Sequence, residues 1–323
     1  MEHTKKPLPD RLTFFPITAF ASILGLGGFT ILLDKWRHLQ WLPSWPYFLM
    51  AGVVTALFSL LLILYAHKTI RAFPLVIKDY QHKVRINFIA AISISLLILS
   101  IIYMGCCPFA SLSLWYMGTI FHSVIMFVIF KRWINHEFDI HHFNPAWFIP
   151  VVGLVLIPVA GVDYAPGEII FFYFANGVIF WLIFFTIALY RIIFHPPIPA
   201  KLAPTLFMLM APPAVIFISY IRITMHFDLL AKSLLLITFF IAILLLFVKR
   251  QFAKLDFFMS WWAFTFPLDA LSIAITLAFL VTRNAVYMYL SWAASLTALS
   301  VLSLVIFYTV KGVLAGKICV QED

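Results

Sequence analysis

The segment FTFPLDA at residues 264–270 places a proline inside a long apolar run, and the chain repeats this arrangement. Similar segments are TFFPITAF at 13–20, WFIPVVG at 147–153 and LMAPPAV at 209–215, while NFIAAIS at 87–93 has alanine in place of proline. The repeated positions are 74, 60, 62 and 55 residues apart and are Pro16, Ala90, Pro150, Pro212 (followed by Pro213) and Pro267. Proline inside a helix removes a backbone hydrogen bond and bends the helix, which lipid tolerates only where protein or water satisfies the freed carbonyl. The pattern predicts five kinked helices around a central path, as in a transport protein.

The composition indicates that most of the chain lies in a membrane. Hydrophobic residues make up 64% of the 323 positions and charged residues 11%, whereas a soluble domain is about half apolar and a quarter charged. Ten apolar runs are long enough to cross a hydrocarbon core of about 30 Å. They are 12–33, 46–67, 86–104, 108–130, 146–162, 166–190, 203–222, 229–248, 257–281 and 285–310. We therefore expect an all-α membrane protein, with residues 1–323 forming one transmembrane domain.

The basic residues predict the orientation of the chain. If the N-terminus is cytoplasmic, 17 of the 22 lysines and arginines fall on the inner side. These are Lys5, Lys6, Arg11, Lys68, Arg71, Lys78, Lys83, Arg85, Lys131, Arg132, Arg191, Lys201, Lys249, Arg250, Lys254, Lys311 and Lys317. This bias follows the positive-inside rule and predicts that both termini are cytoplasmic. A basic face against anionic lipid also explains the net charge of +9 without nucleic acid as a partner.

The predicted spans differ in kind along the chain. Even-numbered spans such as SLLLITFFIAILLLFV at 233–248 are bulky and apolar all round, as expected of a helix facing lipid. Spans one, five, seven and nine carry the prolines, and the odd-numbered spans also offer small hydroxyl side chains, namely Thr18, Ser93, Ser95, Thr265 and Ser272. These hydroxyls either line the path or bond the backbone of their own helix, and the sequence does not decide between the two.

Charged and cofactor-binding residues are sparse inside the spans. Because no lysine or arginine lies near the middle of any span, the sequence does not favour a retinal protein. A bis-histidine haem site is not favoured either, because only His122 lies deep in a span, and we expect no cofactor. An anion path without fixed positive charge binds weakly and releases quickly, which suits a channel.

Asp269 is the exception, and an ionisable residue within a span is a functional hypothesis by default. Three interpretations remain open for Asp269. It is neutral or bonded to a neighbouring helix, or it couples protons or sets selectivity, or it lies outside the true span.

Two further groups of residues raise the question of metal or redox chemistry. The inner loop NHEFDIHHF holds His136, Glu137, Asp139, His141 and His142 but lacks a recognised zinc pattern, so a solvated polar turn is favoured over a metal site. Cys106 and Cys107 are adjacent, a spacing that forms a disulfide only with strain. We therefore expect neither a metal centre nor a redox role.

Four segments resemble the tellurite-resistance/dicarboxylate transporter family, which includes bacterial TehA proteins and the plant slow-type anion channels. They are NPAWFIPVVG at 144–153, WWAFTFPLDALSIA at 261–274, HKVRINFIAAIS at 82–93 and FPITAFASIL at 15–24. The resemblance implies ten helices forming five helical hairpins in quasi-fivefold arrangement around a central pore. It also implies a homotrimer with one pore per subunit in a bacterial-type inner membrane.

The resemblance further implies that a phenylalanine in the ninth helix closes the pore, and the matching residue is Phe266, immediately before Pro267. The alternative is a core aromatic side chain that packs against the first span. Bacterial relatives tend to have glycine two residues before the first proline, where this chain has Phe14. Phe14 therefore either narrows the throat or shares the role of Phe266.

Two functions remain from the sequence. The favoured one is an anion channel or facilitator for small anions, gated by Phe266. The other is a proton-coupled carrier of C4-dicarboxylate, sulfite or tellurite-type oxyanions that uses Asp269. An enzyme is not expected, because the spans hold no nucleophile–base pair. The short ends at 1–11 and 311–323 predict no regulatory domain of the plant-channel type.

Overall fold

The computed structural model describes residues 11–248, 252 and 255–316, and all regular secondary structure in these residues is helical. The α-helices are α1 (Ala21–His38), α2 (Trp45–Arg71), α3 (Phe73–Gln81), α4 (Arg85–Tyr103), α5 (Pro108–Asn135), α6 (Phe148–Gly161), α7 (Gly167–Phe194), α8 (Ala211–Thr224), α9 (Leu229–Phe247), α11 (Thr265–Thr282) and α12 (Ala285–Leu314). Short 3-10 helices precede several of them, namely η1 (Arg11–Phe14), η2 (Ile17–Phe20), η3 (Ile140–His142), η4 (Pro145–Trp147), η5 (Ala200–Leu209) and η6 (Met259–Phe264). Lys5, Lys6, Lys249, Arg250, Lys254, Lys317 and most of the predicted polar ends lie outside the described residues.

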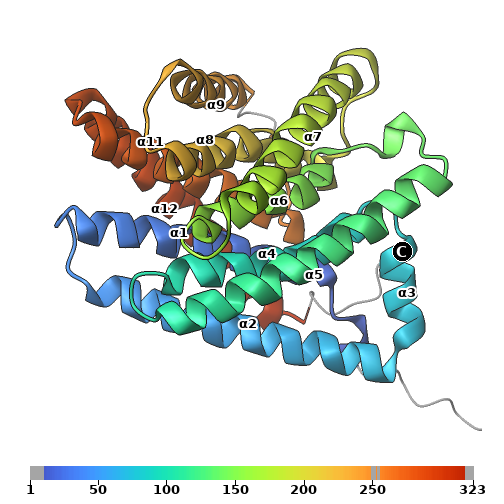
Figure 1. Ribbon diagram of the computed structural model, residues 1–323. Coiled ribbons are helices and arrows are strands. Elements are labelled where there is room, and N and C mark those ends of the chain that lie inside the picture. The colour runs from blue at the N-terminus through green and yellow to red at the C-terminus, as the bar shows by residue number, and fades with distance from the viewer. Residues whose placement is uncertain (1–10, 249–251, 253–254, 317–323) are drawn as a thin grey trace, which may run out of the picture.

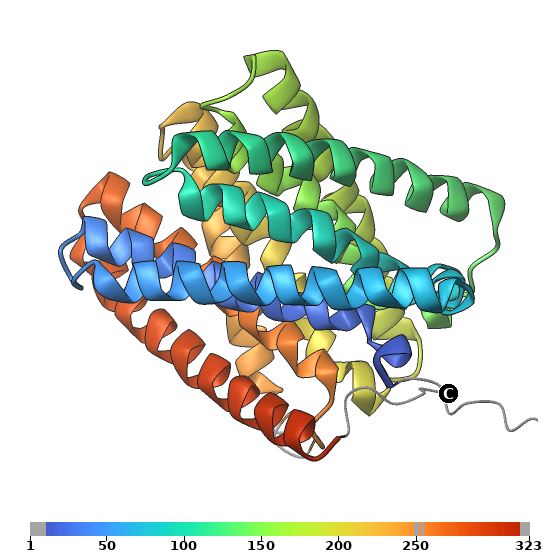
Figure 2. The same ribbon diagram turned by 90° about the horizontal axis from the view of Figure 1, so that it is seen from below.

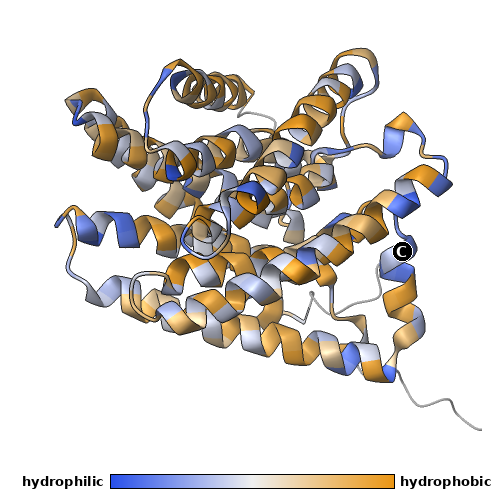
Figure 3. Cartoon of the chain, viewed as in Figure 1, coloured by the Kyte–Doolittle hydropathy of each residue, from blue (hydrophilic) through white to orange (hydrophobic). Residues whose placement is uncertain are grey.

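Nine helical segments of the described chain are long and apolar enough to cross a membrane, and a shorter apolar one covers Pro145–Gly161. Hydrophobic residues run along most of each helix and hydrophilic residues gather mainly at the ends (Figure 3). The protein is thus an all-helical, multi-pass membrane protein, as the sequence predicts. The segment at 146–162 differs from the prediction because its α-helix, α6, has only 14 residues.

The helices fall into a buried and an exposed class. In the segments that contain α1, α4, α8 and α11, between 67% and 89% of the apolar window is buried, and every residue of α6 is buried. In α2, α5, α7, α9 and α12 the buried share is only 22–39%. These five helices expose large apolar side chains, such as Phe127, Phe240 and Leu296, that are suited to lipid.

Packing follows the same two classes. Each buried helix packs against the exposed helix that follows it, as α4 does against α5 and α11 against α12. The buried helices also pack against one another in the order α1, α4, α6, α8, α11 and back to α1. α2 runs along the lower edge of the molecule in Figure 1, and α12, coloured red, lies along an outer edge in Figure 2. Below, α1, α4, α6, α8 and α11, with the 3-10 helices that lead into them, are called the inner segments.

The prolines lie where the helix type changes. Pro150 and Pro267 are the third residues of α6 and α11, Pro212 and Pro213 are the second and third of α8, and Pro16 directly precedes η2. Proline fits the first turn of an α-helix because the N–H it lacks would have no partner there. The predicted mid-helix bends therefore take the form of a 3-10 segment that ends as an α-helix begins.

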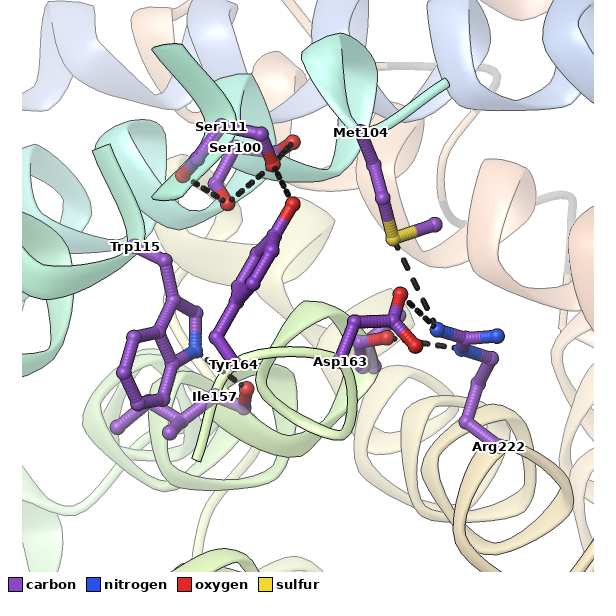
Figure 4. A network of polar contacts seen from close by, with 9 residues as sticks. Ser100, Met104, Ser111, Trp115, Ile157, Asp163, Tyr164 and Arg222 are labelled. Carbon is purple, nitrogen blue, oxygen red and sulfur yellow. Dashed lines mark hydrogen bonds and ion pairs between the residues drawn. The ribbon is translucent and has the colours of Figure 1, made fainter. Parts of the chain in front are cut away.

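The carboxyl end of α6 is held by side chains from two other helices. Fourteen residues span about 21 Å, so this end falls short of a hydrocarbon core of about 30 Å. Trp115 Nε1 of α5 donates to the carbonyl of Ile157 at 2.9 Å, and Arg222 Nε of α8 donates to the carbonyl of Val159 at 3.0 Å. Arg222 also pairs with Asp163 at 2.8 Å (Figure 4). Polar groups at this depth are thus satisfied by neighbouring helices.

Candidate permeation site

A narrow apolar cavity, called the throat cavity below, lies between the inner segments. Its volume is about 30 Å³, room for only about two water molecules. All five inner segments contribute to its wall. The lining residues are Ala21, Leu24, Phe88, Ala91, Ile94, Phe148, Ile149, Val152, Met208, Ala211, Trp262, Ala263, Phe266 and Pro267.

Phe266 lines the throat cavity together with Pro267 and is 9% exposed. The preceding residue, Thr265, points elsewhere. Its hydroxyl donates to the carbonyl of Trp262 at 2.8 Å, and a Cβ added to Gly25 of α1 would lie 2.0 Å from that hydroxyl oxygen. Thr265 therefore packs against α1, while Phe266 borders the cavity.

A larger cavity of about 430 Å³, called the vestibule, adjoins the throat cavity through Phe88, which lines both. Polar and basic side chains contribute to its wall, among them Thr18, Arg85, Lys201 and Thr205. The open space therefore narrows from a basic vestibule to an apolar throat.

The structure places the other predicted hydroxyls away from these cavities. Ser95 Oγ donates to the carbonyl of Ala91 at 2.7 Å. Ser93 Oγ lies 2.9 Å from both the carbonyl of Ala90 and Nδ1 of His122. Of the five predicted hydroxyls, Thr18 is the one that lines the vestibule, whereas Ser93, Ser95, Thr265 and Ser272 bond their own helix backbone.

His122 is fully buried and joins three helices. Its Nε2 lies 2.9 Å from the carbonyl of Pro150 in α6, and its Nδ1 contacts Ser93 in α4. This geometry is that of a packed, hydrogen-bonded histidine.

Asp269 is fully buried in α11, and neither carboxylate oxygen has a hydrogen-bond partner among the described residues. It lies against α1, where a Cβ added to Gly28 would be 3.0 Å from Oδ2. It does not line the throat cavity. A buried carboxyl group without partners is costly in its ionised form, so the site favours a proton or another bound group on Asp269.

A third cavity, called the side cavity, has a volume of about 90 Å³ and is lined by Thr13, Phe14, Pro16, Ile17, Thr18, Lys68, Leu75, Lys78, Asp79 and Arg85. The structure thus places Phe14 here and not among the residues that line the throat cavity with Phe266.

The side cavity contains a buried ion pair that the sequence analysis missed. Lys68 Nζ lies 2.5 Å from Asp79 Oδ2, and Arg85 Nη1 lies 3.2 Å from Asp79 Oδ1. The available signal was a lone carboxylate, Asp79, within the basic stretch 68–85.

Local contacts hold the histidine loop in the described chain. The backbone N–H of His141 donates to Asp139 at 2.7 Å and holds the pKa of that carboxyl group below its usual range. His142 contacts Lys83 Nζ at 3.2 Å. Within the residues described, no group of three or more His, Cys, Asp and Glu side chains could hold a metal ion. Cys106 and Cys107 are free thiols.

Comparison with known proteins connects this architecture to one family. The family model described as voltage-dependent anion channel (SLAC1) matches residues 14–310. This chain belongs to that family. The resemblance seen in four short segments is confirmed, and the protein is a member of an anion-channel family and not an enzyme.

The relatives include plant and archaeal proteins. The S-type anion channel SLAH2 of Arabidopsis thaliana is 28% identical over 331 residues, covering 95% of this chain and 62% of the relative. The guard cell S-type anion channel SLAC1 of the same plant is 27% identical, covering 80% of this chain and 49% of the relative. The uncharacterized transporter MJ0576 of Methanocaldococcus jannaschii is 26% identical, covering 88% of this chain and 89% of the relative. The chain thus spans about half to two thirds of the plant channels' length.

Proposed function

We propose that this protein is an anion channel or facilitator whose ions pass from the vestibule through the throat cavity. The observation that carries the proposal is that all five inner segments, each of which contains or directly follows one of the repeated sequence positions, contribute to one narrow cavity. In this proposal each inner helix and the exposed helix after it form a helical hairpin, and the five hairpins surround the pore in quasi-fivefold arrangement. The substrates are small inorganic or organic anions.

In the same proposal Phe266 is the gate. Its aromatic ring borders an apolar space with room for only about two water molecules, which is too small for an anion with its hydration shell, so the pore is closed while the ring stays there. The 3-10 helix η6 gives way to the α-helix α11 just before Pro267. The backbone beside the Phe266 ring therefore lacks a continuous series of α-helical hydrogen bonds. A rotamer change of Phe266 then opens the throat.

The test is anion current across a planar bilayer, comparing the wild type with Phe266→Ala. We expect an anion-selective current at least about tenfold larger in the variant, equivalent to a barrier lower by roughly 1.4 kcal/mol.

Phe264→Ala is the matched control for this experiment. Phe264 is 7% exposed on the same segment, but it packs against Phe207 and Phe252, with ring centroids 4.8 and 5.7 Å away, and does not line the throat. Its current should equal that of the wild type. Equal currents in Phe266→Ala and wild type, or an equal rise in both variants, would contradict a gate at Phe266.

A second candidate function rests on Asp269. A fully buried carboxyl group without a hydrogen-bond partner suits a site that takes up and releases a proton, as a proton-coupled carrier of dicarboxylate, sulfite or tellurite-type oxyanions requires. In liposomes with an inward proton gradient, Asp269→Asn should then abolish gradient-driven uptake, whereas Glu168→Gln, at an exposed acid of α7, should not. If Asp269→Asn leaves the flux intact, the carrier proposal fails.

The proposed setting is a bacterial-type inner membrane, with both termini cytoplasmic and three copies of the chain forming a homotrimer. The broad apolar surfaces of α2, α5, α7, α9 and α12 provide area for both lipid and subunit contacts. The mass of the detergent-solubilised particle, corrected for detergent, tests the trimer directly. A particle of one chain would contradict it.

A further inference from the structure

Two cationic side chains lie on the throat-facing sides of inner helices, three turns beyond the throat cavity. Leu24 of α1 and Ala211 of α8 line that cavity. Lys35 and Arg222 follow them by eleven residues in the same helices, which is within about 20° of three full turns and roughly 16 Å further along. Both cations therefore face the central axis at the end of the inner helices away from the vestibule, called the far mouth below.

The contacts of Arg222 bring several inner segments together at this point. Its Nε donates to the carbonyl of Val159 in α6 at 3.0 Å, and its Nη2 lies 3.8 Å from Met104 Sδ, just after α4 (Figure 4). The Lys35 ammonium of α1 also interacts electrostatically with Arg222. In the closed order of the inner helices α8 is a neighbour of neither α1 nor α4. These contacts therefore place the Arg222 guanidinium inside the ring of inner helices.

Lys35 is the cation of the far mouth that has no acid of its own. Asp163 pairs with Arg222 at 2.8 Å, and Asp34, the acid beside Lys35 in the sequence, pairs with Arg37 at 2.9 Å. The partly exposed Lys35 side chain makes no hydrogen bond or ion pair within the described residues. Arg222 likewise keeps one nitrogen, Nη1, without a partner among these residues. Free N–H donors on two neighbouring like charges favour an anion between them.

Asp163 competes with an incoming anion for Arg222. Its side chain is 45% exposed and that of Arg222 25%, so the pair is partly open to water. Such pairs add little net stability, because water and salt screen them. The bond from Arg222 to Val159 uses Nε, whereas the bond to Asp163 uses Nη2. An anion can therefore replace the carboxylate while Arg222 still holds the end of α6.

We propose that Lys35 and Arg222 bind one small inorganic anion at the far mouth, in competition with Asp163. The proposal deepens the proposed function and rests on it, because the site lies on the same path, beyond the apolar throat. Basic side chains around a pore attract anions. Lys35 and Arg222 supply at the far mouth the positive charge that the throat lacks.

The first experiment measures binding without any current. Thermal unfolding of the purified protein in detergent is titrated with chloride or nitrate against gluconate at constant ionic strength. We expect a saturable rise in unfolding temperature with the small anions, and Lys35→Gln should raise the half-saturating concentration about fivefold or more. The control is Lys232→Gln, at an exposed lysine near the start of α9 and outside the ring, which should leave half-saturation unchanged.

Asp163→Asn separates an anion site from charges that only stabilise the fold. It removes the competing carboxylate, so it should lower the half-saturating concentration, whereas Lys35→Gln raises it. Lys35→Arg keeps the charge and should stay close to the wild type. Opposite shifts in Asp163→Asn and Lys35→Gln support the site. Unchanged half-saturation in Lys35→Gln, or no anion-specific stabilisation of the wild type, overturns it.

Currents in the Phe266→Ala background distinguish this site from the proposed gate. If that variant conducts, adding Lys35→Gln should raise the anion concentration at half-maximal current about fivefold when the anion enters from the far mouth. Conduction that does not depend on Lys35 would leave the pore standing and overturn the site. If Phe266→Ala stays silent while Lys35→Gln weakens anion stabilisation, the gate fails and anion binding at the far mouth stands.

Discussion

Gly153 of α6 leaves the space that the His122 imidazole occupies. A Cβ on Gly153 would lie 2.0, 2.4 and 2.7 Å from Cε1, Nε2 and Nδ1 of that ring. The ring is also fixed by its contacts to Ser93 and to the carbonyl of Pro150, so it has no room to move aside. The missing side chain at Gly153 thus lets α5 reach across to both α4 and α6.

The residue-scale prediction is that Gly153→Ala destabilises the protein. Overpacking against a hydrogen-bonded ring should lower the free energy of unfolding by about 1–3 kcal/mol. The control is Gly52→Ala in α2, where an added Cβ meets no atom within 4 Å and alanine favours the helix by roughly 0.5–1 kcal/mol. Chemical unfolding in detergent measures both, and equal effects from the two substitutions would refute the packing argument.

At the scale of elements, the sequence predicts where apolar helices occur better than it predicts which type of helix begins each segment. Hydropathy alone placed the apolar segments, because crossing lipid requires a long apolar run whatever its partners. It did not predict that Pro150 and Pro267 would follow a 3-10 segment, because proline restricts the first helical turn without specifying what precedes it. Nor could it pair Lys68 with Asp79, since that contact depends on how α3 packs against the end of α2. The prediction that Phe266 lies at the throat rested on the family resemblance and not on hydropathy.

The element-scale prediction concerns the end of α6. Arg222→Met should lower the free energy of unfolding by about 1–3 kcal/mol, because the Val159 carbonyl and Asp163 both lose their partner. The stability of Arg222→Lys should lie between those of the wild type and Arg222→Met. An ammonium can pair with Asp163 but cannot reproduce both guanidinium bonds. Arg283→Met is the control, at an exposed arginine just after α11 whose side chain makes no hydrogen bond in the described chain. A loss at Arg283→Met as large as at Arg222→Met would mean that charge, not capping of α6, is responsible.

For the whole molecule, the distribution of basic residues sets the expected orientation, and the native cysteines offer a direct way to measure it. Cys107 is exposed and Cys106 half-buried in the turn between α4 and α5, on the side expected to be external. Cys319 follows the last span and lies outside the described residues, on the side expected to be cytoplasmic. The three thiols therefore report on opposite faces of one chain.

The prediction is that a membrane-impermeant maleimide labels sealed right-side-out vesicles at Cys106 and Cys107 alone. The thiolate is the reacting species, so labelling at about pH 8 keeps the exposed thiol reactive. The double variant Cys106→Ser/Cys107→Ser should then be silent in sealed vesicles and gain one label when the membrane is permeabilised, because Cys319 becomes accessible. Labelling of the double variant in sealed vesicles would place the C-terminus outside. That result would reverse the proposed orientation, in which both termini are cytoplasmic, and with it the side of the membrane on which the vestibule opens.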